Sequence, residues 1–153
     1  MAGALLITQD EGKWYALLAR ESSGLGWRDF GGLGEPGEDS LALAARMLTR
    51  NTMGLVGGAD ETHVLVSESQ KIIRRGNYTC FVIVARPEPA LPTYIRRAFR
   101  YEEVRNERHS GQLVLDNASW VPMDGCPHRL LRSWFRPIFE EVRRWASTQR
   151  VKC

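Results

Sequence analysis

The sequence feature that most constrains the fold is a glycine-rich turn that leads directly into a helix, at residues 32–55. The turn follows the aromatic segment 27–30 and ends at Asp39 or Ser40, either of which can cap the first turn of a helix with its side-chain oxygen. The apolar positions of the helix recur at spacings of three and four, at Leu41, Ala44, Ala45 and Leu48. We expect Gly54 to occupy the C′ position that ends the helix.

Strand patterns surround this unit on both sides. Residues 3–9 and 13–20 are expected to form a hairpin, and residues 78–85 are the strongest strand in the chain because they are rich in β-branched and aromatic side chains. Weaker patterns predict a short strand at 27–32, a strand at 62–69, a hairpin turn at 70–77, and a strand, a turn and a second strand at 112–121.

Two further segments have helical spacing. Residues 91–105 begin with a proline in the first turn and carry apolar residues at helical intervals. Residues 130–145 show the same periodicity, but Pro137 interrupts it, so two helices that meet near Arg136 are expected rather than one. At 153 residues, the chain is expected to form a single domain over 1–153.

The spacing within 32–55 resembles the Nudix box. Gly32 is followed after five residues by Glu38 and after seven more by Arg46, and the closing Gly54 lies one residue late. The resemblance implies an α/β (α+β) fold, a Nudix-like α/β/α sandwich with a mixed central sheet, in which the helix at 91–105 is an insertion. It also implies a structural clamp between Glu38 and Arg46; the alternative is that Glu38 is a solvated acid in the first turn.

The departures from the Nudix pattern fall on the metal ligands. Family members hold divalent cations with three glutamates on one helix face, and the corresponding residues here are Met47, Arg50 and Asn51. Mg²⁺ prefers hard oxygen ligands, whereas these side chains offer a thioether, a fixed positive charge and one neutral carbonyl. Arg50 would also repel the cation: at about 4 Å, two unit charges near a protein surface repel by about 4 kcal/mol, and a divalent ion is repelled more strongly. We therefore expect neither catalytic residues nor a metal at this helix, and no cofactor.

A relocated site is the alternative. It would be a pyrophosphohydrolase of the Nudix type that uses Mg²⁺ or Mn²⁺ and takes its carboxylates from outside the helix. The available acids are Glu35, Glu38, Glu103 and Glu107.

Arginine supplies nearly all of the positive charge, because lysine occurs only at positions 13, 71 and 152. Arginine suits planar recognition of phosphate, although a GC-rich genome gives the same bias without selection for binding. The residues expected to contact phosphate or RNA are Arg28, Arg46, Arg50, Arg74 and Arg75. Arg50 has the alternative of facing solvent or pairing with Glu35 or Glu38.

These observations leave three functions. The first is a catalytically degenerate Nudix-like domain that serves as a structural or RNA/nucleotide-binding subunit of a larger assembly, with protein subunits, RNA or nucleotide as partners. The second is the relocated hydrolase, and the third is a purely protein-binding scaffold subunit. The three scattered cysteines predict a reducing intracellular compartment, cytoplasmic or organellar, and the absence of a long apolar run predicts no membrane insertion.

Overall fold

The protein is described from a computed structural model, which covers residues 1–21, 24–105 and 115–149; for 101–105 and 115–116 only the backbone is described. The strands are β1 (Ala2–Asp10), β2 (Lys13–Glu21), β3 (Trp27–Arg28), β4 (Phe30–Gly32), β5 (Lys71–Arg75), β6 (Tyr78–Val84) and β7 (Leu115–Pro122). The helices are α1 (Ser40–Asn51), α2 (Ala59–Ser67), α3 (Leu91–Arg105) and α4 (Arg136–Ser147), with a 3₁₀ turn η1 (His128–Leu130). No helix in the described ranges is long and apolar enough to cross a membrane.

The sheet is mixed and centred on β1. Its strand order is β3-β2-β1-β6-β5, with β4 paired to β1 and β7 paired to β2. The first half of β1 pairs with β4 and its second half with β2, both antiparallel, while β6 runs parallel along the other side. The predicted hairpin of the first two strands and the mixed central sheet are therefore confirmed.

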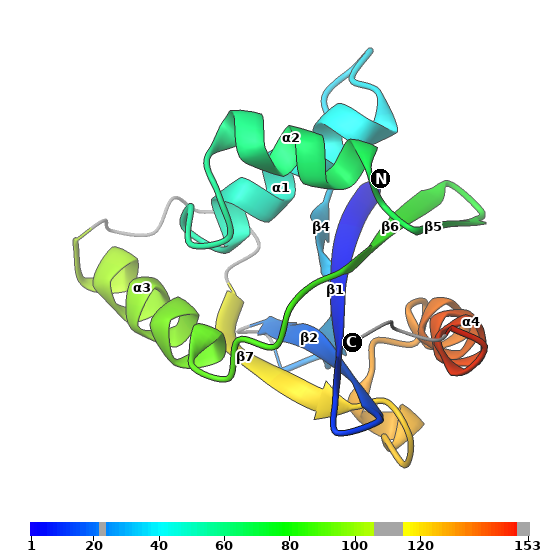
Figure 1. The fold of residues 1–153 in the computed structure, drawn as a ribbon. Coiled ribbons are helices and arrows are strands. Elements are labelled where there is room, and N and C mark those ends of the chain that lie inside the picture. The colour runs from blue at the N-terminus through cyan, green and yellow to red at the C-terminus, as the bar shows by residue number, and fades with distance from the viewer. Residues whose placement is uncertain (22–23, 106–114, 150–153) are drawn as a thin grey trace.

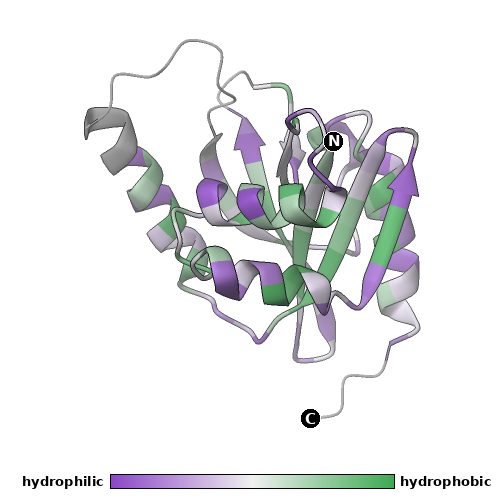
Figure 2. Ribbon diagram, turned by 90° about the horizontal axis from the view of Figure 1, so that it is seen from above, coloured by the Kyte–Doolittle hydropathy of each residue, from purple (hydrophilic) through white to green (hydrophobic). Residues whose placement is uncertain are grey.

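Helices cover both faces of the sheet, so the predicted α/β/α sandwich is confirmed (Figure 1). Alternate residues of β1 enter two different cores, because successive strand side chains point to opposite faces. Ala4 and Leu6 pack with α1, α2 and α3, whereas Leu5 and Ile7 pack with α4. Figure 2 shows the hydrophobic residues concentrated on the central strands between these layers.

Helix α1 begins and ends with local hydrogen bonds that the sequence partly predicts. The Asp39 carboxylate accepts from the Ala42 amide at 2.8 Å, so Asp39 rather than Ser40 is the N-cap. At the other end Thr52 is the C-cap, which places Met53 at C′ with φ 53° and Gly54 after it with φ 74°. The amides of Met53 and Gly54 donate to the carbonyls of residues 50 and 49, as in a Schellman motif. The prediction of Gly54 at C′ was therefore wrong by one residue.

The predicted strand at 62–69 is wrong, because α2 occupies most of this segment. Its valines alternate as in a strand, but Thr62 and Val66, one helical turn apart, are the residues that are buried. The acids Asp60 and Glu61 lie in the first turn, where the helix dipole favours them. The hydroxyls of Thr62 and Thr49 lie 2.5 Å apart, which joins α2 to α1.

Two other boundaries differ from the sequence prediction. The segment 70–77 is mostly strand β5, and only Gly76 and Asn77 form the turn into β6. Strand β7 is continuous over 115–122 with an irregularity opposite residues 20 and 21, where a strand, a turn and a second strand were predicted; residues 112–114 lie outside the described ranges. The helix at 91–105 is confirmed as α3, and its status as an insertion stays a prediction.

As predicted, the C-terminal segment is not one long helix, but it also lacks the predicted first helix that would run from residue 130 to near Arg136. It forms η1, a short connection, and then α4, which begins at Arg136 with Pro137 in its first turn, where proline needs no amide partner. Gly26, with φ 122°, gives this connection room, because a Cβ there would lie 3.0 Å from the Leu130 carbonyl oxygen. The Arg132 amide donates to the Trp27 carbonyl at 2.9 Å and so holds the connection against β3.

Candidate functional site

The helix face that resembles a metal site is divided between the core and the solvent. Met47 is only 7% exposed, and its sulfur lies 2.8 Å from where a Cβ on Gly32 would stand. Arg50 is exposed and Asn51 is half-buried. A thioether and a guanidinium offer Mg²⁺ or Mn²⁺ no oxygen ligand and an amide offers one neutral oxygen, so this face lacks the carboxylates on which such sites usually depend.

The framework of the box is preserved as an ion pair. Arg46 donates to both oxygens of Glu38, from Nε and from Nη2, each at 2.8 Å. The Glu35 amide donates to Glu38 Oε1 at 3.1 Å, which fixes the glycine-rich loop onto the helix. The hydrogen bonds from Arg46, followed by that from the Glu35 amide, lower the pKa of Glu38 to about 2.

This clamp predicts a pH-dependent contribution to stability. Because folding lowers the Glu38 pKa from 4.5 to about 2, its contribution is complete above pH 4.5 and is lost as the pH falls toward 2. We expect Glu38→Gln to lower the melting temperature near pH 6 and to flatten its decline between pH 4.5 and 2. Thermal melts across that range test this, with Glu35→Gln, whose side chain is exposed, as the control. Parallel pH curves for Glu38→Gln and wild type would contradict the clamp.

The acids proposed for a relocated metal site do not converge in the part of the structure that can be described. Both oxygens of Glu38 accept from Arg46, and Glu35 is exposed on the loop. The side chain of Glu103 and all of Glu107 lie outside the described residues. Among the described residues, no three His, Cys, Asp or Glu side chains lie together where they could hold a metal ion.

A cavity of about 380 Å³ lies on the other side of Gly32 from Met47, between the β4 and β6 strands and α4. Three arginines line it together with one acid and two aromatic rings: Arg28, Arg75, Arg132, Glu21, Tyr78 and Trp134. Its volume is within the range of about 300–1,000 Å³ that is usual for small-molecule sites. We call it the arginine cavity.

Arg28 is the most buried of these arginines, with an exposed fraction of 5%. Its Nη1 donates to Glu21 Oε1 at 3.0 Å, and its guanidinium carbon lies 4.7 Å from the centre of the Trp134 ring. The neighbouring carboxylates, Asp29 most strongly, raise the Arg28 pKa against the opposing effect of burial, so the group stays charged. Two contacts thus fix the plane of the guanidinium at the cavity wall.

Behind this wall, a buried carboxyl is joined to a tyrosine. The Tyr78 hydroxyl donates to Asp29, with distances of 2.8 and 2.7 Å to the two carboxyl oxygens. Burial raises the Asp29 pKa, and Arg28 opposes that shift. Gly3 and Gly31 make room for the hydroxyl, because a Cβ on either would lie 2.2 Å from it.

The structure brings together some of the arginines that the sequence singled out, but not all. Arg28 and Arg75 both line the arginine cavity, and Arg75 also pairs with Glu141 at 3.3 Å. Arg46 is held by Glu38, and Arg50 and Arg74 are exposed without lining this cavity. Sequence reasoning missed Arg132, whose Nη1 lies 3.6 Å from Glu21, because only the folded connection before α4 brings it to β2.

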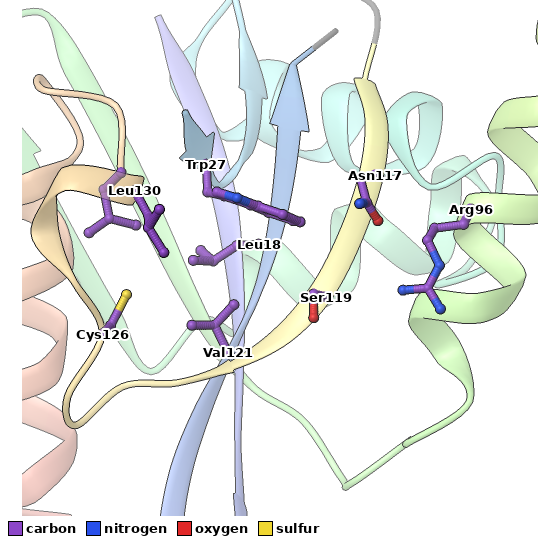
Figure 3. A pocket seen from close by; sticks show the side chains of 9 residues that line it. Leu18, Trp27, Arg96, Asn117, Ser119, Val121, Cys126 and Leu130 are labelled. Carbon is purple, nitrogen blue, oxygen red and sulfur yellow. The ribbon is translucent and has the colours of Figure 1, made fainter. Parts of the chain in front are cut away.

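A smaller cavity of about 270 Å³ lies over β2, β3 and β7. Leu18, Trp27 and Val121 reach it from three different strands, and Asn117 and Ser119 lie along β7 (Figure 3). Leu130 and Leu131 line this cavity whereas Arg132 lines the arginine cavity, so the connection before α4 borders both. Its lining is mostly apolar, with polar groups along β7 and Arg96 from α3.

Comparison with solved structures identifies the fold. The chain has a Nudix-like fold: similar solved structures cover nearly its whole length and are Nudix hydrolases. No family model and no curated protein matches the sequence.

The similar structures include two of a C. elegans Ap4A hydrolase. The binary complex has a TM-score of 0.59 and 13% identity, covering 97% of this chain and 98% of that one. The other has a TM-score of 0.55 and 12% identity, covering 95% and 94%. RenU, a Nudix hydrolase from M. smegmatis, gives 0.54 and 18%, covering 96% and 85%. A shared fold at these identities does not determine activity.

Proposed function

We propose that this protein is a catalytically degenerate Nudix-like domain that binds a phosphate-bearing ligand, a nucleotide or an RNA end, without hydrolysing it, as a subunit of a larger assembly. The observation that carries this proposal is the composition of the helix face at Met47, Arg50 and Asn51, which is unfit for a divalent cation. The helix itself and its Glu38–Arg46 clamp are intact.

The helix lacks the metal-binding carboxylates but keeps the Glu38–Arg46 clamp. This combination fits a fold that serves for binding. Water activation on this fold depends on the cation, so a face without carboxylates leaves the reaction without its nucleophile. Binding needs only donors that match the phosphate oxygens, and arginine side chains supply these. The three arginines that line one cavity next to α4 favour binding over a purely structural role.

The test measures binding and cleavage in parallel. Labelled AMP, ATP, Ap4A and a 5′-phosphorylated RNA are titrated with the protein in EDTA and followed by fluorescence anisotropy. The same ligands are then incubated with the protein and 10 mM Mg²⁺ and examined by chromatography. We expect saturable binding in EDTA for at least one ligand, weakened by salt because phosphate contacts are ionic, and full recovery of intact ligand with Mg²⁺.

Other outcomes separate the alternative functions. Mg²⁺-dependent release of a nucleoside monophosphate or of phosphate would support the relocated hydrolase instead. An absence of binding to every member of the panel would favour the protein-binding scaffold. Glu103→Gln and Glu107→Gln are the variants to examine if cleavage is found, because those side chains lie outside the described residues and the structure does not exclude them from a relocated site.

A further inference from the structure

We propose that the arginine cavity is an oxyanion site, in which the Nε–H groups of Arg28 and Arg132 both donate to one phosphate group of the ligand. The proposal gives the ligand of the previous subsection an anchoring point away from the Met47 helix face. It rests on the proposed function only in naming phosphate as the oxyanion.

The first observation is a buried donor that has no acceptor. Arg28 is 5% exposed and lines the cavity, yet its Nε has no hydrogen-bond partner among the described residues. Asp29 Oδ1 is the nearby carboxylate oxygen, and at 3.7 Å it is beyond hydrogen-bond reach. Buried polar groups in folded proteins are almost always paired, so an Nε–H without an acceptor, in a side chain that lines a cavity, indicates a missing acceptor.

The second observation is that Arg132 repeats this pattern from a different part of the chain. Its Nε is also buried and without an acceptor in the described part of the structure, and its side chain lines the same cavity. Both arginines use an Nη1 atom for Glu21, at 3.0 Å from Arg28 and 3.6 Å from Arg132. Glu21 therefore pairs with both guanidinium groups, while neither Nε has an acceptor among the described residues.

The other charged groups around the cavity limit what can enter. Arg75 lies on the wall and pairs with Glu141 at the surface, while Glu21 and the buried Asp29 are the acids beside Arg28. Because these acids lie beside the arginines, the positive charge of the cavity is partly neutralised. Selection of an anion thus depends on the two directed donors and on the fixed plane of Arg28 over Trp134.

A phosphate group suits this geometry better than a carboxylate does. It offers three or more acceptor oxygens, so two donors from different directions can be satisfied by different oxygens of one group. A carboxylate has two oxygens in one plane and pairs best with the fork of a single guanidinium. Inorganic phosphate and acetate therefore distinguish the two kinds of ligand.

The experiment observes the arginine Nε–H groups directly by ¹⁵N NMR on the full chain. Inorganic phosphate is titrated into wild type, Arg132→Gln and Arg28→Lys, with Arg129→Gln as the matched control because Arg129 is an exposed arginine that does not line the cavity. We expect the Nε–H signals of Arg28 and Arg132 to shift saturably with phosphate and at least tenfold more weakly with acetate. Each cavity variant should weaken phosphate binding at least tenfold, and Arg129→Gln should not.

Each result decides the inference separately from the proposed function. Phosphate binding that is unchanged in both cavity variants overturns the oxyanion site. Nucleotide binding that leaves both Nε–H signals unshifted also overturns it, although that result still supports the proposed function. Phosphate that shifts these signals while no nucleotide or RNA binds supports the oxyanion site and counts against the proposed function. Arg28→Lys keeps the charge, so a loss of binding with its fold intact, seen in the amide spectrum, identifies the directed donor as the cause.

Discussion

Replacing Met47, Arg50 and Asn51 together by glutamate is expected to create a Mg²⁺ site on α1. The three positions lie at i, i+3 and i+4, so their carboxylates share one helix face next to Gly32. Without metal, a carboxylate at the 7% exposed position 47 and the repulsion among the three acids should lower the unfolding free energy by about 2 kcal/mol or more. With a dissociation constant of about 0.1 mM, 10 mM Mg²⁺ should restore about 2.7 kcal/mol.

Thermal melts with and without Mg²⁺, together with calorimetric titration, measure both effects. The matched control carries glutamine at the same three positions, because it keeps the size and shape of the new side chains without their charge. Mg²⁺ should stabilise the glutamate variant and leave the glutamine variant and wild type unchanged. A folded glutamate variant that binds no Mg²⁺ would show that this helix does not present the three positions as the Nudix pattern requires.

The second large effect is expected at Gly31, where alanine should destabilise the fold by about 3 kcal/mol. A Cβ there would stand 2.2 Å from the Tyr78 hydroxyl and 2.7 Å from both the Ala2 carbonyl oxygen and the Gly3 Cα. Overpacking a rigid site typically costs about 1–3 kcal/mol, and two of these three contacts are with backbone that cannot rotate away. Chemical denaturation of Gly31→Ala tests the prediction.

Two further variants make that result specific. Gly58→Ala is the control, because a Cβ there would meet only the flexible Glu61 carboxylate, at 2.8 Å, and we expect a change below about 1 kcal/mol. Adding Tyr78→Phe to Gly31→Ala removes the hydroxyl but leaves the backbone contacts, so stability should not recover. If Gly31→Ala proves as stable as wild type, the close approach of β1, β4 and Tyr78 is wrong.

The parts of the fold that the sequence predicts well are those in which local signals and tertiary packing agree. Helix α1 has a capping aspartate, apolar residues at helical spacing and a glycine near its end, and only the C′ position was misplaced. Helix α2 was mistaken for a strand because its valines and threonine favour strands, whereas burial of Thr62 and Val66 against α1 decided the structure. Packing against another element leaves no mark in the pattern of the segment itself.

The residues of the candidate site also fall into two groups, those that the local sequence predicts and those that it does not. The substituted positions 47, 50 and 51 and the Glu38–Arg46 clamp follow from the resemblance to the Nudix box, which can be aligned because they lie within one loop and one helix. The arginine cavity does not, because Glu21, Arg28 and Arg132 come from three separate segments that meet only in the folded chain. Arg132 gives no local signal. Arg46 was expected both to pair with Glu38 and to contact phosphate, and the structure shows the pairing.

The central claim, that the domain binds phosphate-bearing ligands without cleaving them, is tested most directly by ³¹P NMR of one equivalent of nucleotide mixed with the protein in 10 mM Mg²⁺. One series of spectra recorded over time reports both binding and cleavage. Binding shifts or broadens the phosphate signals, and cleavage produces new ones. We predict shifted or broadened signals and no new ones for at least one of ATP, Ap4A and AMP. New product signals that depend on Mg²⁺ and on the protein would contradict the account.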